Sequence, residues 1–254
     1  MIRLEQLHKS FGRQKVLENY SLHVHPGESF VILGRSGIGK SVTLKHIVGL
    51  LKPDQGKIFV DGEDITHADK ATLFRVRHKV AYLFQSAALI NWLTVGKNVE
   101  LPLLEHTKLS RRDIRQRAMQ ALDELDMSSA YDKMPVDISG GMKKRAALAR
   151  VLVMEPAIIL YDEPTAGLDP IMTNNIARLI RDVQETHDVT SITVTHDLES
   201  AYHIADRIGM HDQGRIIETG TVLEMRRSDN PVVRAFLRGE SSDSLKTRNN
   251  RVKE

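Results

Sequence analysis

One stretch of the chain combines residue types that bind phosphate. Residues 34–41 follow the apolar run 29–33 and precede a predicted helix over 42–51. Backbone N–H groups of a glycine-rich turn and the positive end of the following helix attract anionic oxygens. The Lys40 ammonium would reach the outer phosphates of a nucleotide, and the Ser41 hydroxyl would coordinate Mg²⁺. The strand–turn–helix context favours this phosphate site over a chance glycine loop. The site comprises Gly34, Arg35, Ser36, Gly37, Ile38, Gly39, Lys40 and Ser41.

Two carboxylates follow the continuous apolar run 157–161, which predicts a buried parallel strand. Adjacent carboxylates at the end of a buried strand are costly unless a cation lies beside them. Mg²⁺ bound to a nucleotide would supply that cation. Asp162 would then belong to the metal shell, and Glu163 would orient and polarise the attacking water.

Two further polar residues follow predicted strands. Gln85 comes after the apolar run 80–84, and His196 comes after the β-branched run 191–195. The carboxyl ends of parallel strands line one crevice, where ligands bind. A single histidine at a strand end is usually structural. Because Gly34 and Asp162 also come directly after predicted strands, we instead expect all four residues to belong to one site.

A second helix start is also rich in glycine. Ser139 has the character of an N-cap and is followed by Gly140 and Gly141, then by an alanine-rich helix with one apolar face. Such a start can bind an anion, or it can be an ordinary capped helix. The residues alone leave both readings open.

Phe11 stands beside the predicted turn at Gly12. An aromatic ring there can stack on a purine base, an interaction worth about 1–3 kcal/mol in nucleic-acid systems. A core position is the alternative.

The elements that must position these residues alternate between strand and helix. Short alternating segments predict an antiparallel unit over 1–30 and a related strand at 57–60, whereas the buried runs predict a parallel sheet. Helices are expected over 69–78, 100–105, 111–126, 171–186, 197–210 and 230–238, with a hairpin around 212–214. The predicted fold class is therefore α/β with a mixed, mainly parallel core sheet.

The amino-acid composition excludes few classes of protein. The chain has 254 residues, of which 41% are hydrophobic and 27% charged, and this is ordinary for a globular protein. It contains no cysteine, which excludes disulfides and thiolate chemistry. A formal charge of +3 neither demands nor forbids nucleic acid or an anionic membrane surface. The first residues do not have the pattern of a signal peptide, and no run is long enough to span a bilayer.

Taken in order, these motifs resemble the ATP-binding subunits of ABC transporters over residues 1–238. The resemblance identifies Phe11 as the adenine-stacking aromatic, 34–41 as the Walker A loop and Gln85 as the Q-loop glutamine. It identifies Ser139-Gly140-Gly141 as the signature motif and 160–163 as the end of Walker B, with Glu163 as the catalytic glutamate. The D-loop is 166–169, ending in Asp169, and the switch histidine is His196.

The resemblance implies a P-loop NTPase fold and Mg²⁺-dependent ATP hydrolysis. It implies one ABC ATPase domain over 1–238, with an antiparallel β-subdomain (1–30 and 57–66), a nucleotide-binding core (31–87 and 151–225) and a helical signature subdomain (88–150). A flexible polar tail over 239–254 would follow. It also implies a head-to-tail homodimer enclosing two ATP molecules, in which Ser139 and Gly141 contact the γ-phosphate held by the other protomer. No nucleic acid partner is expected.

One departure narrows the resemblance. The signature motif commonly ends in Gln, whereas here the residue is Met142. The stretches 138–150 and 83–89 are similar to those of Mla-type (MlaF-like) phospholipid-trafficking ATPases. This implies an MlaE-like integral-membrane permease, a small STAS-like protein and an MCE-domain protein as partners.

The same likeness implies a position on the cytoplasmic face of the inner membrane in a Gram-negative-type envelope. The apolar group 89–93 would contact the permease, although a buried satellite core is the alternative. Another cargo (an amino acid, a metal or a drug) remains open, as does a non-transport ABC ATPase acting on nucleic acid.

Overall fold

The computed structural model describes residues 1–240, so positions 241–254 of the predicted tail lie outside the described residues. The described chain forms two compact units. The first contains 1–67 and the part from Val194 onward, and the second contains 68–193. The subdivision into β, core and helical parts proposed from the sequence stays a prediction.

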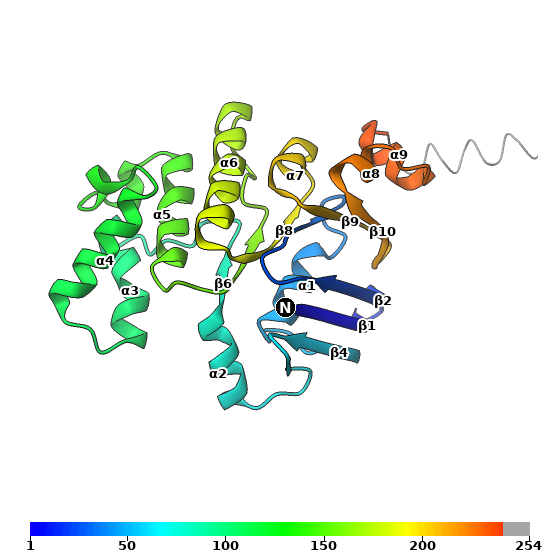
Figure 1. Ribbon diagram of the computed structural model, residues 1–254, viewed down its shortest axis with the longest axis horizontal. Coiled ribbons are helices and arrows are strands. Elements are labelled where there is room, and N and C mark those ends of the chain that lie inside the picture. Colours follow the sequence, from blue (N-terminus) through cyan, green and yellow to red (C-terminus); the bar gives the residue numbers. More distant parts are fainter. Residues whose placement is uncertain (241–254) are drawn as a thin grey trace, which may run out of the picture. The chain divides into compact units, whose positions relative to one another are not determined.

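The first unit contains an antiparallel sheet (Figure 1). Its strands lie in the order β2 (Gln14–Val24), β1 (Ile2–Phe11), β4 (Gln55–Val60) and β5 (Glu63–Asp64). Tyr20, Leu22 and Val24 are buried on one face of β2, as their alternation predicts. The predicted antiparallel segment is therefore confirmed.

The first unit also holds strands that carry the phosphate loop. β9 (Arg207–Asp212) runs parallel to β3 (Ser29–Leu33) and antiparallel to β10 (Arg215–Thr221). Its helices are α1 (Lys40–Ile47), α7 (Leu198–Ile204), α8 (Val222–Arg226) and α9 (Pro231–Leu237). All five residues of β3 are buried, which fixes the start of the loop that follows.

The predicted helix over 197–210 is wrong in its second half. α7 ends at Ile204, and the chain then enters β9. Asp206 donates its N–H to the Ser29 carbonyl at 2.8 Å, and the following residues pair with β3 in parallel register. Pairing with a buried strand therefore prevails over local helical pattern. The predicted hairpin turn is confirmed, with Gln213 and Gly214 both at positive φ.

The second unit alternates helices with parallel strands. In chain order it contains α2 (Lys70–Lys79), β6 (Val80–Leu83), α3 (Val95–His106), α4 (Arg111–Asp123), α5 (Gly140–Leu152), β7 (Ile158–Asp162), α6 (Pro170–His187) and β8 (Thr190–Thr195), whose last two residues belong to the first unit. β6 and β7 pair in parallel. With the parallel β3–β9 pair, this confirms the mixed α/β class.

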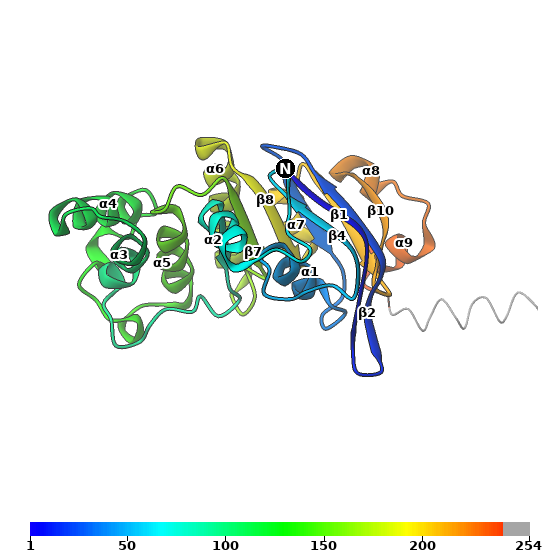
Figure 2. The same cartoon turned by 90° about the horizontal axis from the view of Figure 1, so that it is seen from below.

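Three helices of the second unit, α3, α4 and α5, lie side by side (Figure 2). α3 begins at Val95 rather than at 100, because the Thr94 hydroxyl caps it by accepting the Lys97 N–H. The buried Asn98 amide of α3 also holds the segment before the helix. It donates to the Ile90, Leu93 and Thr94 carbonyls and accepts the Ile90 N–H. Within residues 1–240, no helix is both long enough and apolar enough to cross a membrane.

Candidate active site

The phosphate loop lies in the first unit, between β3 and α1. Lys40 begins α1 and is 4% exposed. Its ammonium Nζ donates to the Gly34 carbonyl at 2.7 Å and to the Arg35 carbonyl at 2.8 Å. The loop therefore curves around the lysine and holds its charge beside the first turn of α1.

The N-terminus of α1 has a glycine where other helices have a capping side chain. Gly39 occupies the N-cap with φ of 103°, and a Cβ there would lie 2.4 Å from Val16 Cγ1. The other eight α-helices within residues 1–240 each have an N-cap side chain that accepts a backbone N–H. The amide donors of the first turn of α1 have no such cap, and they lie beside a buried ammonium. This donor set fits the phosphates of a nucleotide.

His196 and the phosphate loop meet within the first unit. His196 is exposed and directly follows β8, and the preceding residue, Thr195, accepts the Gly34 N–H at 3.3 Å. A cavity of about 590 Å³ is lined by residues that include Arg35, His196 and Phe236. The Arg35 guanidinium donates to the Glu240 carbonyl at 2.9 Å, so this side chain is engaged with the C-terminal segment.

His211 is a titratable residue near the loop that the sequence analysis missed. It lies on β9 and is 1% exposed. Burial, with a smaller effect of the Lys40 charge, lowers the pKa of His211 to about 4. Within the described residues neither ring nitrogen has a hydrogen-bond partner, and the ring lies 5.3 Å from that of Tyr20. A neutral imidazole therefore lies under the loop.

Phe11 ends β1 and is 46% exposed. Lys9 Nζ lies 5.7 Å from the centre of its ring. The exposure argues against the core position that the sequence left open and is consistent with a ring that stacks on a ligand.

The carboxylates lie in the second unit, at the carboxyl end of β7. Asp162 is the last residue of the strand and Glu163 follows it with φ of 46°, and they are 7% and 9% exposed. β6 ends beside β7, with Leu83 opposite Tyr161, so Gln85 emerges at the same edge. The predicted grouping of Gln85 with the two carboxylates is thus present within this unit. The left-handed backbone of Glu163 is costly for a residue with a side chain.

Lys144 supplies a cation beside these carboxylates. It is 7% exposed, and its Nζ donates to the Gln85 carbonyl at 2.6 Å. Burial lowers the pKa of Lys144, while the negative charges of Asp162 and Glu163 act in the opposite direction. From the sequence, only Mg²⁺ was expected to supply this charge. A usable signal was present, because Lys144 falls on the helix face that also carries the buried Leu148 and Val151.

The signature segment begins α5 as predicted. The Ser139 hydroxyl accepts the Met142 N–H at 3.3 Å, which confirms it as the N-cap. Gly140 is exposed, whereas a Cβ on Gly141 would lie 2.0 Å from Met172 Cε of α6. Asp169 caps α6 by accepting the Met172 N–H at 3.0 Å. The signature and D-loop residues are therefore adjacent helix caps in the second unit.

The segment after Gln85 is held by α5. Arg150 donates to the Ala87 carbonyl at 2.9 Å and to the Ala88 carbonyl at 2.7 Å. Both alanines have positive φ, 62° and 47°. Trp92 is 80% exposed, so it is not part of a buried satellite core.

Comparison with known proteins agrees with these features. The ABC transporter family model matches residues 17–166. The chain is 41% identical over 238 residues to the "Probable ribonucleotide transport ATP-binding protein mkl" of Mycobacterium leprae, covering 94% of this chain and 69% of the relative. It is 38% identical over 246 residues to the "Intermembrane phospholipid transport system ATP-binding protein MlaF" of Haemophilus influenzae, covering 97% and 93%.

A solved structure extends the comparison to the fold. The dimeric, post-hydrolysis ATP-binding cassette MJ0796, bound to ADP and Pi, superposes with a TM-score of 0.79 and 32% identity. The match covers 87% of this chain and 99% of that one. The family model spans more than half of the chain. The chain belongs to the ABC transporter family and is an ABC-type ATPase.

Proposed function

We propose that this chain hydrolyses ATP with Mg²⁺ as the energy-supplying subunit of a transporter that moves phospholipid between membranes. The observation that carries the cargo assignment is the likeness to MlaF, which extends over nearly the whole chain. The active-site roles rest on the motifs and on the contacts described above.

The residues of the first unit would bind the nucleotide. Backbone donors of 34–41 and the first turn of α1 would hold the phosphates, and the Lys40 ammonium would neutralise charge on the terminal ones. The Phe11 ring would stack on the adenine. His196 would contact the γ-phosphate and help to fix its orientation.

The residues of the second unit would activate water. Mg²⁺, when bound, supplies positive charge that stabilises the developing negative charge on the phosphate oxygens. From this unit, Gln85 and Asp162 would hold this ion. The Glu163 carboxylate would accept a proton from the attacking water.

We further propose that two copies associate head to tail. Ser139, Gly140, Gly141 and Asp169 would then contact the nucleotide bound by the opposite protomer. The exposure of Ser139 and Gly140 supports such a contact. An MlaE-like permease at the inner membrane, with STAS-like and MCE-domain proteins, would complete the assembly, and the exposed Trp92 is suited to contact it.

A second cargo has its own support. The mycobacterial relatives with 41% identity are named as ribonucleotide transport proteins. Ribonucleotide is therefore the alternative cargo.

The role of Glu163 is tested by Glu163→Gln. We expect nucleotide affinity close to that of the wild type and ATP turnover lowered roughly 10²- to 10⁴-fold, because the amide cannot accept the proton. Glu185→Gln, on the exposed face of α6, is the matched control and should retain turnover. A Glu163→Gln variant with a wild-type rate would exclude the base assignment.

The cargo is tested by co-purifying the chain with its membrane permease and reconstituting the complex in vesicles. Labelled phospholipid and labelled ribonucleotide are then followed with ATP present or absent. ATP-dependent movement of phospholipid alone is expected. Movement of ribonucleotide alone would overturn the phospholipid assignment.

A further inference from the structure

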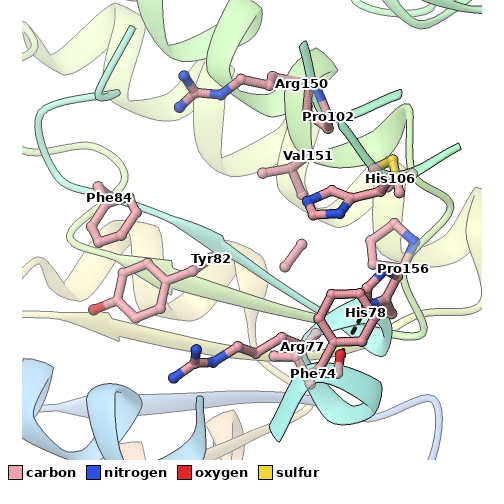
Figure 3. A pocket seen from close by; sticks show the side chains of 13 residues that line it. Phe74, Arg77, His78, Tyr82, Phe84, Pro102, His106, Arg150, Val151 and Pro156 are labelled. Atoms are coloured by element: carbon pink, nitrogen blue, oxygen red, sulfur yellow. Dashed lines mark hydrogen bonds between the residues drawn. The ribbon is translucent and has the colours of Figure 1, made fainter. Parts of the chain in front are cut away.

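Tyr82 connects one of the carboxylates to a pocket of the second unit. Its hydroxyl donates to Asp162 Oδ2 at 2.8 Å. Its ring helps to line a pocket of about 520 Å³, together with Phe84, and the two ring centres lie 4.4 Å apart. Figure 3 shows the two rings side by side, with the Tyr82 hydroxyl directed away from His78 and His106. One side chain thus contacts both the pocket and the end of β7.

The contact between Tyr82 and Asp162 is a directional hydrogen bond, in which the tyrosine hydroxyl donates and the carboxylate oxygen accepts. It therefore restricts the rotation of the Asp162 carboxylate about its terminal bond.

We propose that Tyr82 is a positioning residue that orients the Asp162 carboxylate for the metal ion. The inference rests on the proposed function, in which Asp162 belongs to the Mg²⁺ shell. Partners that hydrogen-bond to a metal ligand fix its orientation, and their loss typically weakens metal binding by 10- to 100-fold. Tyr82 stands in this relation to Asp162.

The position of the Tyr82 ring depends in turn on the pocket. Phe84 is 40% exposed and packs on this ring at the pocket rim. Removing the Phe84 ring would let Tyr82 move and would loosen the bond to Asp162. The effect of Phe84→Ala on metal binding should therefore have the same direction as that of Tyr82→Phe and be smaller.

The test compares Tyr82→Phe with the wild-type full chain. Mn²⁺ binding in the presence of a non-hydrolysable ATP analogue is measured by electron paramagnetic resonance, and binding of the same analogue is measured in EDTA. We expect the Mn²⁺ dissociation constant to rise about 10-fold. Binding of the metal-free analogue should not change, because Tyr82 is assigned no contact with nucleotide.

Tyr131→Phe is the matched control. The Tyr131 hydroxyl is also hydrogen-bonded to a buried carboxylate, that of Glu100, in the same unit. Its loss should lower the melting temperature and leave Mn²⁺ binding unchanged. If Tyr82→Phe behaves in the same way, its bond is structural only and the inference is overturned.

Asp162→Asn separates the inference from the function on which it rests. If Asp162→Asn weakens Mn²⁺ binding and Tyr82→Phe does not, the positioning role fails alone. If neither variant changes Mn²⁺ binding, the assignment of Asp162 to the metal shell fails as well, and the proposal for Tyr82 falls with it.

Discussion

The helices α1 and α5 both begin next to glycines, but they use them differently. α1 has Gly39 as its N-cap and no capping side chain. In α5 the Ser139 hydroxyl already accepts one of the first-turn N–H groups. Gly39 is required by its backbone, with φ of 103°, whereas a Cβ on Gly141 would meet only the flexible end of the Met172 side chain.

This difference indicates distinct tasks for the two helix starts. The donors of α1 lie beside the buried Lys40 and have no side-chain cap, which suits tight binding of phosphate within one chain. The start of α5 is capped and lies against Met172 of α6, so its conformation is already set within the chain. Such a surface is suited to contact a ligand that another molecule brings to it.

The largest effect should come from Lys40→Ala at the first helix start. Because a buried ammonium next to the phosphates is lost, we expect ATP turnover to fall roughly 10³-fold and ATP affinity to fall with it. Equilibrium binding and steady-state hydrolysis measure both. Lys45→Ala, in the last turn of α1, is the control and should bind ATP normally. If the Lys40→Ala variant binds ATP as tightly as the wild type, the start of α1 is not the phosphate site that distinguishes it from the start of α5.

A pH titration of stability tests whether His211, which is buried beneath the phosphate loop, is neutral. The pKa of His211 is lowered to about 4 in the folded protein, from the ordinary histidine value of 6.5. The unfolded chain therefore binds more protons between these values, and the free energy of unfolding should fall as the pH falls from about 6.5 to 4, by roughly 3 kcal/mol from His211.

Urea unfolding across that pH range measures this loss. Burial also lowers the pKa of His46, so both histidines contribute to the slope with the same sign. His211→Gln isolates one of them and should flatten the profile. An equally steep profile in this variant would show that His211 is not held neutral.

Gly141→Ala addresses the second helix start. The added Cβ would meet Met172 Cε at 2.0 Å, so the flexible end of the Met172 side chain would have to move aside. We expect turnover to fall by roughly 10-fold or less, because the moved side chain disturbs the start of α5, with nucleotide affinity retained. Met172→Ala in the same chain should restore most of the rate. If it does not, the glycine is needed for access of the nucleotide rather than for packing.

Ser139→Ala should have the smallest effect. Loss of the N-cap bond is expected to lower the free energy of unfolding by about 1 kcal/mol, and Ser139→Thr should largely preserve it. Urea unfolding is the measurement. A stability equal to that of the wild type would mean that the α5 cap contributes no more than the uncapped start of α1.

Much of the fold could be predicted because the informative segments are locally consistent. The strand at 29–33, the glycine loop and the following helix were each recognisable from residue type and spacing, and Ser139 was recognisable as a cap. The strand Arg207–Asp212 was not, because its identity depends on pairing with β3, which is distant in sequence.

The missed site residues share one property: each acquires its role from burial next to a distant group. The helix pattern places Lys144 on a buried face, but its partner, the Gln85 carbonyl, is distant in sequence. Tyr82 is an ordinary strand aromatic until its hydroxyl meets Asp162. His211 depends likewise on its buried position under the loop. Motifs therefore revealed the residues proposed to touch the nucleotide, and only packing revealed those that surround them.

The two consecutive left-handed alanines that follow Gln85 and Ser86 have an energetic consequence. A left-handed backbone costs an alanine about 1 kcal/mol or more, and both Ala87 and Ala88 adopt it. The Arg150 guanidinium, which bonds to both carbonyls, offsets this cost from the side of α5. The segment is thus held in a conformation that its own residues disfavour, and the bonds from α5 contribute to keeping it there.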